Sequence, residues 1–357
     1  MYDQIREDIF FFMFYASVAM LSLIACCYLL FRRSNAIAPD VKPPARLRRW
    51  TAAYFAVTTL CHLWYLPTYF LTSSDDMKLG CLIAGLLDSM TVIPLTIIIL
   101  FAMLQDRRRP LWPVVVMVAP LIAGLAWCIA TRNEAILPML YAYILLMWLG
   151  LITYMVRATR QYGRWLRDNY ADLEHKEVWQ SFVVLAIILL VYAIYLLDVG
   201  ETIYEYAMEV INIVLICYLL WRVETLSDLS LHQTTLVASP AKNIGPLLKQ
   251  HCEEPQLYLQ HDISLPQLAQ TIGTNRLYLS QHFSSQGMTY NAYINGLRIQ
   301  HFINLYREAI AAHQLISVQQ LALQSGFRSY STFNAAFKQS MGMTATGWMR
   351  NAGTSES

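Results

Sequence analysis

Charged residues are scarce in this chain. Asp, Glu, Lys and Arg make up 14% of its 357 residues, whereas hydrophobic residues make up 56%, and the mean hydropathy is +0.38. In an average soluble domain about a quarter of the residues are charged. The scarcity of charge argues against an ordinary soluble protein and makes a membrane protein the first expectation.

Paired cysteines are also absent. The seven cysteines lie mostly inside apolar runs, without CxxC spacing, so the sequence indicates neither a disulfide framework nor a zinc site. They are Cys26, Cys27, Cys61, Cys81, Cys128, Cys217 and Cys252. We interpret them as small hydrophobic side chains in helices. No metal and no other cofactor is predicted.

Signatures of catalysis are missing as well. The chain has no Walker loop, HExxH, GxSxG or kinase motif, so an enzyme is not predicted. None of the six lysines lies in an apolar segment, which argues against a retinal protein. Asp88 follows Gly85-Leu86-Leu87 and not the Gly-x-Gly of intramembrane aspartyl proteases, which disfavours that class.

Long apolar segments fill the first two thirds of the chain. A helix needs about 20 apolar residues to cross a bilayer. Seven such segments lie near residues 9–31, 50–71, 79–104, 111–130, 136–156, 178–199 and 203–221. Leu23 to Cys26 faintly resemble a lipoprotein cleavage box, but residues 1–8 are mainly acidic, unlike the basic start of a signal peptide. We therefore expect residues 9–31 to be a retained spanning helix.

Basic residues indicate the orientation, because loops rich in Lys and Arg stay in the cytoplasm. Fourteen of them lie in loops 32–49, 105–110 and 157–177, against Arg6, Lys78 and Arg132 on the opposite side. The sequence thus predicts an outside N-terminus, seven crossings, and a cytoplasmic region from Arg222 onward.

The cytoplasmic region contains a repeat. Ser264 to Gly273 (SLPQLAQTIG) aligns with Ser317 to Gly326 (SVQQLALQSG). Each copy starts with a serine suited to cap a helix and ends with a glycine suited to a left-handed turn. A second helix follows each copy, with inward residues four apart, Leu279 and Phe283 in the first and Phe333 and Phe337 in the second. Residues 290–313 between the copies form an amphipathic pattern that predicts a connecting helix.

A helix, a short glycine turn and a second helix form the plan of a helix-turn-helix DNA reader. The inward pairs fix the second helix, so its opposite face is free for a major groove. Gln, Asn and Arg side chains can read base edges, Ser and Thr can bond bases or phosphates, and Lys neutralises phosphate. The predicted DNA-binding residues are Arg276, Leu277, Ser280, Gln281, Arg328, Ser331, Thr332, Asn334, Ala335 and Lys338. The alternative for this set is a solvated helix face.

Residues 250–350 resemble the DNA-binding domain of the AraC/XylS family of bacterial transcription regulators. The resemblance is most specific in the second unit, from Leu321-Ala322 through Gly326-Phe327 to Phe337-Lys338. It implies two helix-turn-helix units on one long helix, with base contacts near the start of each second helix. The chain departs from the family pattern at Ala345, where a proline is usual. For Arg298, on the connecting helix, we expect a structural role.

The charge of this region is modest. Residues 256–350 carry six basic and two acidic residues, and affinity for DNA depends largely on phosphate neutralisation. We therefore expect weak binding by one chain, raised by a homodimer or by repeated sites.

Ionisable residues inside predicted spans are costly and therefore functional candidates. The predicted ligand-sensing set is His62, Asp88, Asp198, Glu205, Glu209 and Asn212. On the predicted topology all six fall in the outer half of the membrane, where they can form a polar cavity. The alternatives are wet helix ends for Asp198 and Glu205, and mutual pairing for packing in the case of His62, Asp88 and Glu209.

These patterns predict an all-α protein: a seven-helix transmembrane sensor at 1–221, a linker at 222–249, a double helix-turn-helix domain at 250–350 and a flexible tail at 351–357. We expect a membrane-integrated transcription regulator in the bacterial inner membrane. Its expected partners are promoter DNA, the lipid bilayer, RNA polymerase, a second copy of the chain and an unknown small-molecule or envelope signal. The rival prediction is a seven-helix receptor or transporter whose cytosolic domain binds a protein.

Overall fold

The computed structural model describes residues 8–32, 35–39, 41–179, 184, 186–187, 190, 201–229, 244–312 and 317–354. Two compact units divide the chain. The first consists of Met1–Tyr162 and Val178–Asp228, and the second of Gly163–Glu177 and Leu229–Ser357. The described residues are helical, with one isolated antiparallel bridge between Tyr170 and Ser264.

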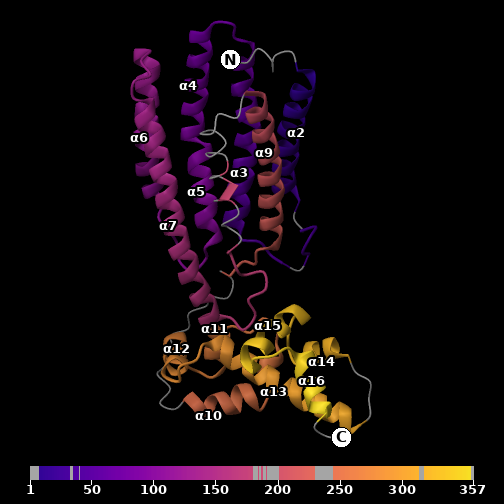
Figure 1. The fold of residues 1–357 in the computed structure, drawn as a ribbon. Coiled ribbons are helices and arrows are strands. Elements are labelled where there is room, and N and C mark those ends of the chain that lie inside the picture. The colour runs from indigo at the N-terminus through magenta and orange to yellow at the C-terminus, as the bar shows by residue number, and fades with distance from the viewer. Residues whose placement is uncertain are drawn as a thin grey trace. The chain divides into compact units, whose positions relative to one another are not determined.

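Long apolar helices make up the first unit, in indigo to magenta and pink in Figure 1. They are α2 (Ile9–Phe31), α3 (Ala45–Tyr65), η1 (Leu66–Phe70), α4 (Ser74–Met90), α5 (Val92–Met103), α6 (Trp112–Thr131), most of α7 (Leu137–Asn169), and α9 (Glu201–Thr225). Asp8 caps α2 by accepting from the amide of Phe11 at 3.1 Å, and Ser73 caps α4.

Helix α3 lies at the centre of the described packing in this unit. It packs against α2, α4, α5 and α9, and α4 also packs against α5 and α6. A local aromatic cluster joins the first and last of these elements, because Phe11 contacts both Tyr69 in η1 and Tyr206 in α9 at ring centroid distances of 5.5 and 5.4 Å. The bundle thereby brings side chains of α2, α3 and α9 together.

Among the described residues, five helical stretches are long and apolar enough to cross a membrane: Ile9–Phe31, Ser74–Met103, Trp112–Thr131, Leu137–Asn169 and Thr202–Thr225. They coincide with five of the seven predicted segments. The predicted second segment is helical in α3 but more polar than these five. The predicted sixth, at 178–199, lies largely outside the described residues, so the count of seven and the orientation stay predictions.

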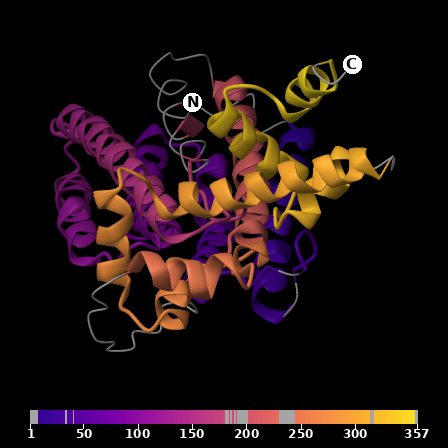
Figure 2. The same cartoon turned by 90° about the horizontal axis from the view of Figure 1, so that it is seen from below.

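The second unit carries the predicted repeat. Its helices are α10 (Ile244–Leu248), the π-helical turn η3 (Lys249–Glu253), η4 (Leu257–Leu259), α11 (Leu265–Thr271), α12 (Arg276–Ser285), α13 (Tyr290–Ala311), α14 (Val318–Gln324), α15 (Tyr330–Met341) and α16 (Ala345–Thr354). Figure 2 shows α13 as the long helix between the orange first half and the yellow second half.

Each half of the second unit has its own core. Leu268, Leu279 and Phe283 are buried in the first core, while Phe333 and Phe337 are buried in the second. The predicted inward positions of both repeats are therefore confirmed. The predicted connecting helix is also confirmed as α13, which contributes Ile294 to the first core and Phe302 to the second.

The predicted start and stop signals of the repeat are confirmed too. Ser264 and Ser317 each form a capping box with the glutamine three residues later. Gly326 has a φ of +89°, and a Cβ on it would lie 2.7 Å from the Cα of Leu259. Only glycine fits this left-handed turn without displacing backbone.

Residues 163–177 belong to the second unit. The sequence placed them in a loop of the membrane half. In the structure they comprise the last residues of α7, which passes from the first unit into the second, and the segment that follows it. The contacts of this segment are described with the site below.

Candidate functional site

Helix α12 presents the predicted reading face of the first repeat. Arg276, Leu277 and Gln281 are exposed, and Ser280 is half-buried. Asn275 precedes the helix and caps it, because its side-chain oxygen accepts from the amide of Tyr278 at 2.9 Å. The cap fixes the start of α12, so the four predicted residues follow from the first turn onward on one side of the helix.

Helix α15 presents the corresponding face of the second repeat. Ser331, Ala335 and Lys338 are exposed, whereas Thr332 and Asn334 are half-buried. Ser329 caps this helix by accepting from the amide of Thr332 at 3.2 Å. The exposed face of α15 therefore has short side chains and one positive charge, supplied by Ser331, Ala335 and Lys338. Such a face suits close approach to a nucleic-acid backbone.

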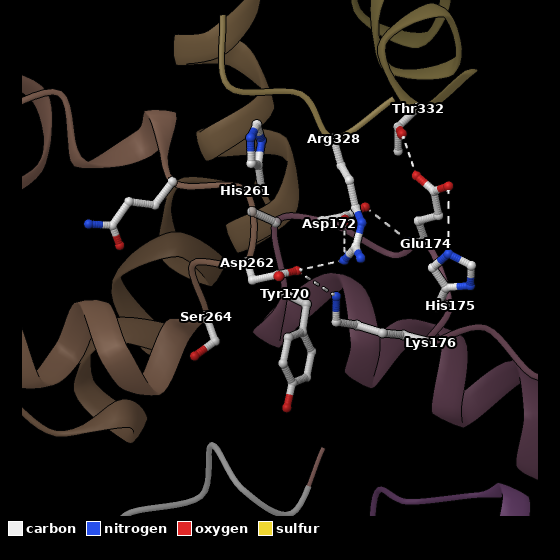
Figure 3. Close-up of polar contacts among 12 residues, drawn as sticks. Tyr170, Asp172, Glu174, His175, Lys176, His261, Asp262, Ser264, Arg328 and Thr332 are labelled. Atoms are coloured by element: carbon white, nitrogen blue, oxygen red, sulfur yellow. Dashed lines mark hydrogen bonds and ion pairs between the residues drawn. The ribbon is translucent and has the colours of Figure 1, made fainter. Parts of the chain in front are cut away.

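Two predicted residues of the second repeat already have partners. Arg328 lies just before α15, and its Nη1 donates to Oδ1 of Asp262 at 3.3 Å and lies 3.9 Å from Oδ2 of Asp172. Thr332 donates through its hydroxyl to Oε2 of Glu174 at 3.2 Å. Figure 3 shows these acidic side chains pointing at Arg328 and Thr332.

Arg298 joins the two repeats from inside the unit. It is 1% exposed and donates to the carbonyl oxygens of Tyr258 and Gln260 at 2.7 Å each. Burial lowers the pKa of its guanidinium to about 10. These contacts agree with the structural role expected for Arg298 and place it away from the reading faces.

The first unit holds a buried polar pair on α3 and α9. Nε2 of His62 lies 3.1 Å from Oε2 of Glu209, and Nδ1 of His62 lies 2.7 Å from the carbonyl oxygen of Thr58. The ring of Tyr15 on α2 packs against the imidazole in a tilted arrangement, with ring centroids 4.5 Å apart. Two of the predicted sensing residues are therefore in direct contact, from helices that are distant in sequence.

Two of the other predicted sensing residues, Asp88 and Glu205, lie in polar contacts of their own. The phenol of Tyr65 donates to Asp88 at 2.8 Å, and Tyr69 donates to Glu205 at 2.8 Å. Asn212 is half-buried on α9. Asp198 lies outside the described residues. The acidic side chains Asp88, Glu205 and Glu209 are thus each paired with a neutral or basic side chain inside the helix bundle.

Sequence reasoning missed the residues that follow α7. Asp172 and Glu174 were taken as parts of a basic loop, yet they contact the second repeat more than 150 residues away. No local pattern marks such a contact. The only signal in the sequence is that positions 172, 174 and 177 are acidic in a loop otherwise rich in arginine.

Comparison with known proteins agrees with the geometry of the second unit. Residues 268–351 match the model of a helix-turn-helix domain family. The TCP pilus virulence regulatory protein of Vibrio cholerae serotype O1 is 32% identical over 76 residues, which are 21% of this chain and 26% of that protein, in each of two strains. The chain therefore spans about a quarter of the length of the curated relatives it matches. No solved structure matches this chain.

Proposed function

From the AraC-type helix-turn-helix domain at its C-terminal end, we propose that this chain is a membrane-integrated regulator that binds promoter DNA and responds to a signal through its apolar helices. The observation that carries the proposal is the pair of capped second helices, α12 and α15, each with a polar face at the surface. The same chain has five helical stretches, within the part that the structure describes, that are long and apolar enough to cross a membrane.

DNA is the proposed partner of the two faces. Arg276 and Gln281 on α12 are suited to base edges, and Lys338 on α15 is suited to phosphate. Leu277, Ser280, Ser331 and Ala335 supply the short or apolar contacts between them. Arg328, Thr332 and Asn334 complete the proposed surface. These residues lie in an AraC-type domain, which favours DNA binding over the alternative of a solvated helix face.

The membrane arrangement is part of the proposal. Arg107 to Arg109 and the basic loops at 32–49 and 157–177 favour the cytoplasm, so the N-terminus lies outside and the second unit lies where DNA is reachable. We assign the sensor to residues 1–221, the linker to 222–249 and the DNA-binding domain to 250–350. The bacterial inner membrane is the proposed location.

The proposed sensor site is the polar cluster of the helix bundle. The buried pair of His62 and Glu209, together with Asp88 and Glu205, supplies charge and hydrogen bonds that a ligand of cationic or hydrogen-bonding character would engage. Asn212 and Asp198 are the remaining members. Binding changes DNA affinity only when the ligand prefers one of two arrangements of the bundle.

A second copy of the chain and RNA polymerase are the further proposed partners. The reading domain carries few positive charges, so one chain gains little from phosphate neutralisation. Two chains on adjacent sites raise occupancy through effective concentration.

The test uses the full-length chain in lipid nanodiscs with a pool of random DNA duplexes. Repeated selection is expected to enrich one motif, and a double substitution of Gln281→Ala and Lys338→Ala is expected to abolish the enrichment. The control is Arg307→Ala, an exposed residue of α13 outside both faces. Failure to enrich any motif, both by the wild-type chain and by the Asn291→Ala chain described below, would favour the rival function, in which the second unit binds a protein.

A further inference from the structure

Residues 170–177, here called the acidic segment, follow α7 and pack against the domain that carries both repeats. The side-chain amide nitrogen (Nδ2) of Asn291 on α13 donates to the carbonyl oxygens of Tyr170 at 3.1 Å and Ala171 at 2.6 Å. The amide of Ala171 donates to the carbonyl oxygen of Ile263 at 3.4 Å. Ala171 is buried in the first core. The start of the acidic segment is therefore fixed to the domain by backbone contacts.

Beyond this anchor the acidic segment reaches the second repeat. Asp172 lies 3.9 Å from the guanidinium of Arg328, and Glu174 accepts from the hydroxyl of Thr332 at 3.2 Å. Lys176 lies 3.5 Å from Asp262, which also pairs with Arg328. Figure 3 shows Asp172, Glu174 and Lys176, on the chain that follows α7, lying next to Arg328, Thr332 and Asp262.

The chemistry of these contacts is the chemistry that DNA would supply. A phosphate offers anionic oxygens to an arginine and to a threonine hydroxyl; here the carboxylate of Glu174 accepts from the Thr332 hydroxyl, and that of Asp172 faces the Arg328 guanidinium as an ion pair at 3.9 Å. The acidic segment carries three acidic residues and one lysine, so it also repels phosphate from this surface. A duplex and the acidic segment therefore compete for the same donors.

Asp172 stands out within this set. It is 2% exposed, and its Oδ2 has no hydrogen-bond donor in the structure. Burial raises the pKa of its carboxyl, against the opposing effect of the Lys176 ammonium. A buried carboxylate whose second oxygen lacks a donor destabilises the docked state, which lowers the free energy needed to release the segment.

We propose that the acidic segment is an autoinhibitory clamp, which holds Arg328 and Thr332 away from DNA until a movement of α7 withdraws it. The inference rests on the proposed function, because it assigns the regulation of the same DNA-binding surface. Helix α7 is a candidate membrane span whose last residues belong to the second unit. A signal that displaces α7 acts directly on Tyr170, one residue after its end.

Two substitutions release the clamp without altering the reading faces. Asn291→Ala removes the donor that holds the carbonyl oxygens of Tyr170 and Ala171, and Glu174→Ala removes the acceptor of Thr332. The matched control is Glu254→Ala, which removes an exposed negative charge elsewhere in the same unit. The full-length chains are compared in nanodiscs on the duplex enriched by random-pool selection, which is repeated with the Asn291→Ala chain.

Both clamp variants are expected to bind the duplex about fivefold more tightly or better, in the usual range of coupling between sites, with the control unchanged. If the wild-type chain binds the duplex and both variants bind it with equal or lower affinity, the inference is overturned and the proposed function stands. Failure of every chain to bind any duplex overturns both. Enrichment by the Asn291→Ala chain alone supports both.

Hydrogen exchange gives a second measurement on the wild-type chain. The amide of Ala171 is bonded in the docked state, so saturation with the duplex is expected to speed its exchange, while the amides of α13 keep their protection. Unchanged exchange at Ala171 in the DNA complex means that the segment stays docked on DNA, and the clamp is then wrong.

Discussion

The guanidinium of Arg298 lies 5.6 Å from the centre of the Phe327 ring, while the same side chain donates to the carbonyl oxygen of Tyr258 at 2.7 Å. Tyr258 belongs to the first core and Phe327 to the second. One buried side chain on the connecting helix therefore bonds to the backbone of one repeat and packs on an aromatic ring of the other. The relative placement of the two reading helices depends on this contact.

Replacement of this arginine is expected to loosen the domain. Arg298→Met keeps much of the volume but leaves the carbonyl oxygens of Tyr258 and Gln260 without their donor, which costs about 3 kcal/mol for buried groups of this kind. Native-state hydrogen exchange of α11 and α13 in the full-length chain measures the loss. Arg307→Met, exposed on the same helix, is the control and is expected to change stability by less than about 0.5 kcal/mol.

Three glycine-to-alanine substitutions separate backbone strain from steric clash. Gly326→Ala places a Cβ against the backbone of Leu259 at positive φ and is expected to cost about 2–4 kcal/mol. Gly273→Ala has positive φ but open space, so about 1 kcal/mol is expected. Gly296→Ala within α13 meets nothing and is expected to stabilise by about 0.5–1 kcal/mol. Exchange protection of the domain gives the order, and equal effects at Gly326 and Gly273 would show that the clash at Leu259 is relieved.

Substitutions on the two reading faces are expected to weaken DNA binding in different ways. Lys338→Ala should weaken binding to all duplexes alike and reduce the slope of log affinity against log salt by about 1, since it removes one phosphate contact. Gln281→Ala should relax the preference at one position of the motif at a cost of about 1–3 kcal/mol for the preferred base. Binding isotherms over a salt series and over single-base variants measure both. A salt-slope change for Gln281→Ala with unaltered base preference would reassign it to phosphate.

The buried pair of His62 and Glu209 is expected to govern the response and not the reading of DNA. Glu209→Gln keeps the shape of the side chain but removes the charge that faces His62, so the two arrangements of the bundle should change in relative stability. In cells with the Glu209→Gln chain, transcription from a reporter gene with the selected site should no longer vary between growth conditions.

Glu134→Gln removes an exposed charge outside the bundle core and is the control for this experiment. Affinity of the Glu209→Gln chain for the duplex, measured in the same nanodiscs, should lie within the range spanned by the wild-type chain with and without signal. A reporter response identical to that of the wild-type chain would count against the polar cluster as a sensor.

Much of the second unit could be predicted from sequence because its signals are local. Ser264 and Gly273 bracket a helix within ten residues, and the spacing of Phe333 and Phe337 fixes which face of α15 is buried. The same holds for the apolar segments of the first unit, where length and composition alone identify the helices. Such elements need no knowledge of distant parts of the chain.

The contacts between distant elements could not be predicted in this way. The sequence identifies His62 and Glu209 as candidates but offers no means to choose between partnership and separate roles, since they are 147 positions apart. The sequence predicts that Arg328 lies on a free face. It does not reveal the partners of Arg328, because these are Asp262 and Asp172, which lie far from it in the chain. Ionic side chains find partners through the fold, and a single sequence does not record which ones.

The DNA-binding unit is assembled from two separate stretches of the chain, and no single cut in the backbone releases it whole. A protease acting between residues 178 and 228 would cut the covalent link between residues 163–177 and 229–357, and the two stretches would then be held together only by the packing around Ala171. A fragment released by such a cut would therefore be two chains and not one. On the proposed topology the intact chain meets its promoter at the membrane, and the DNA has to come to the protein.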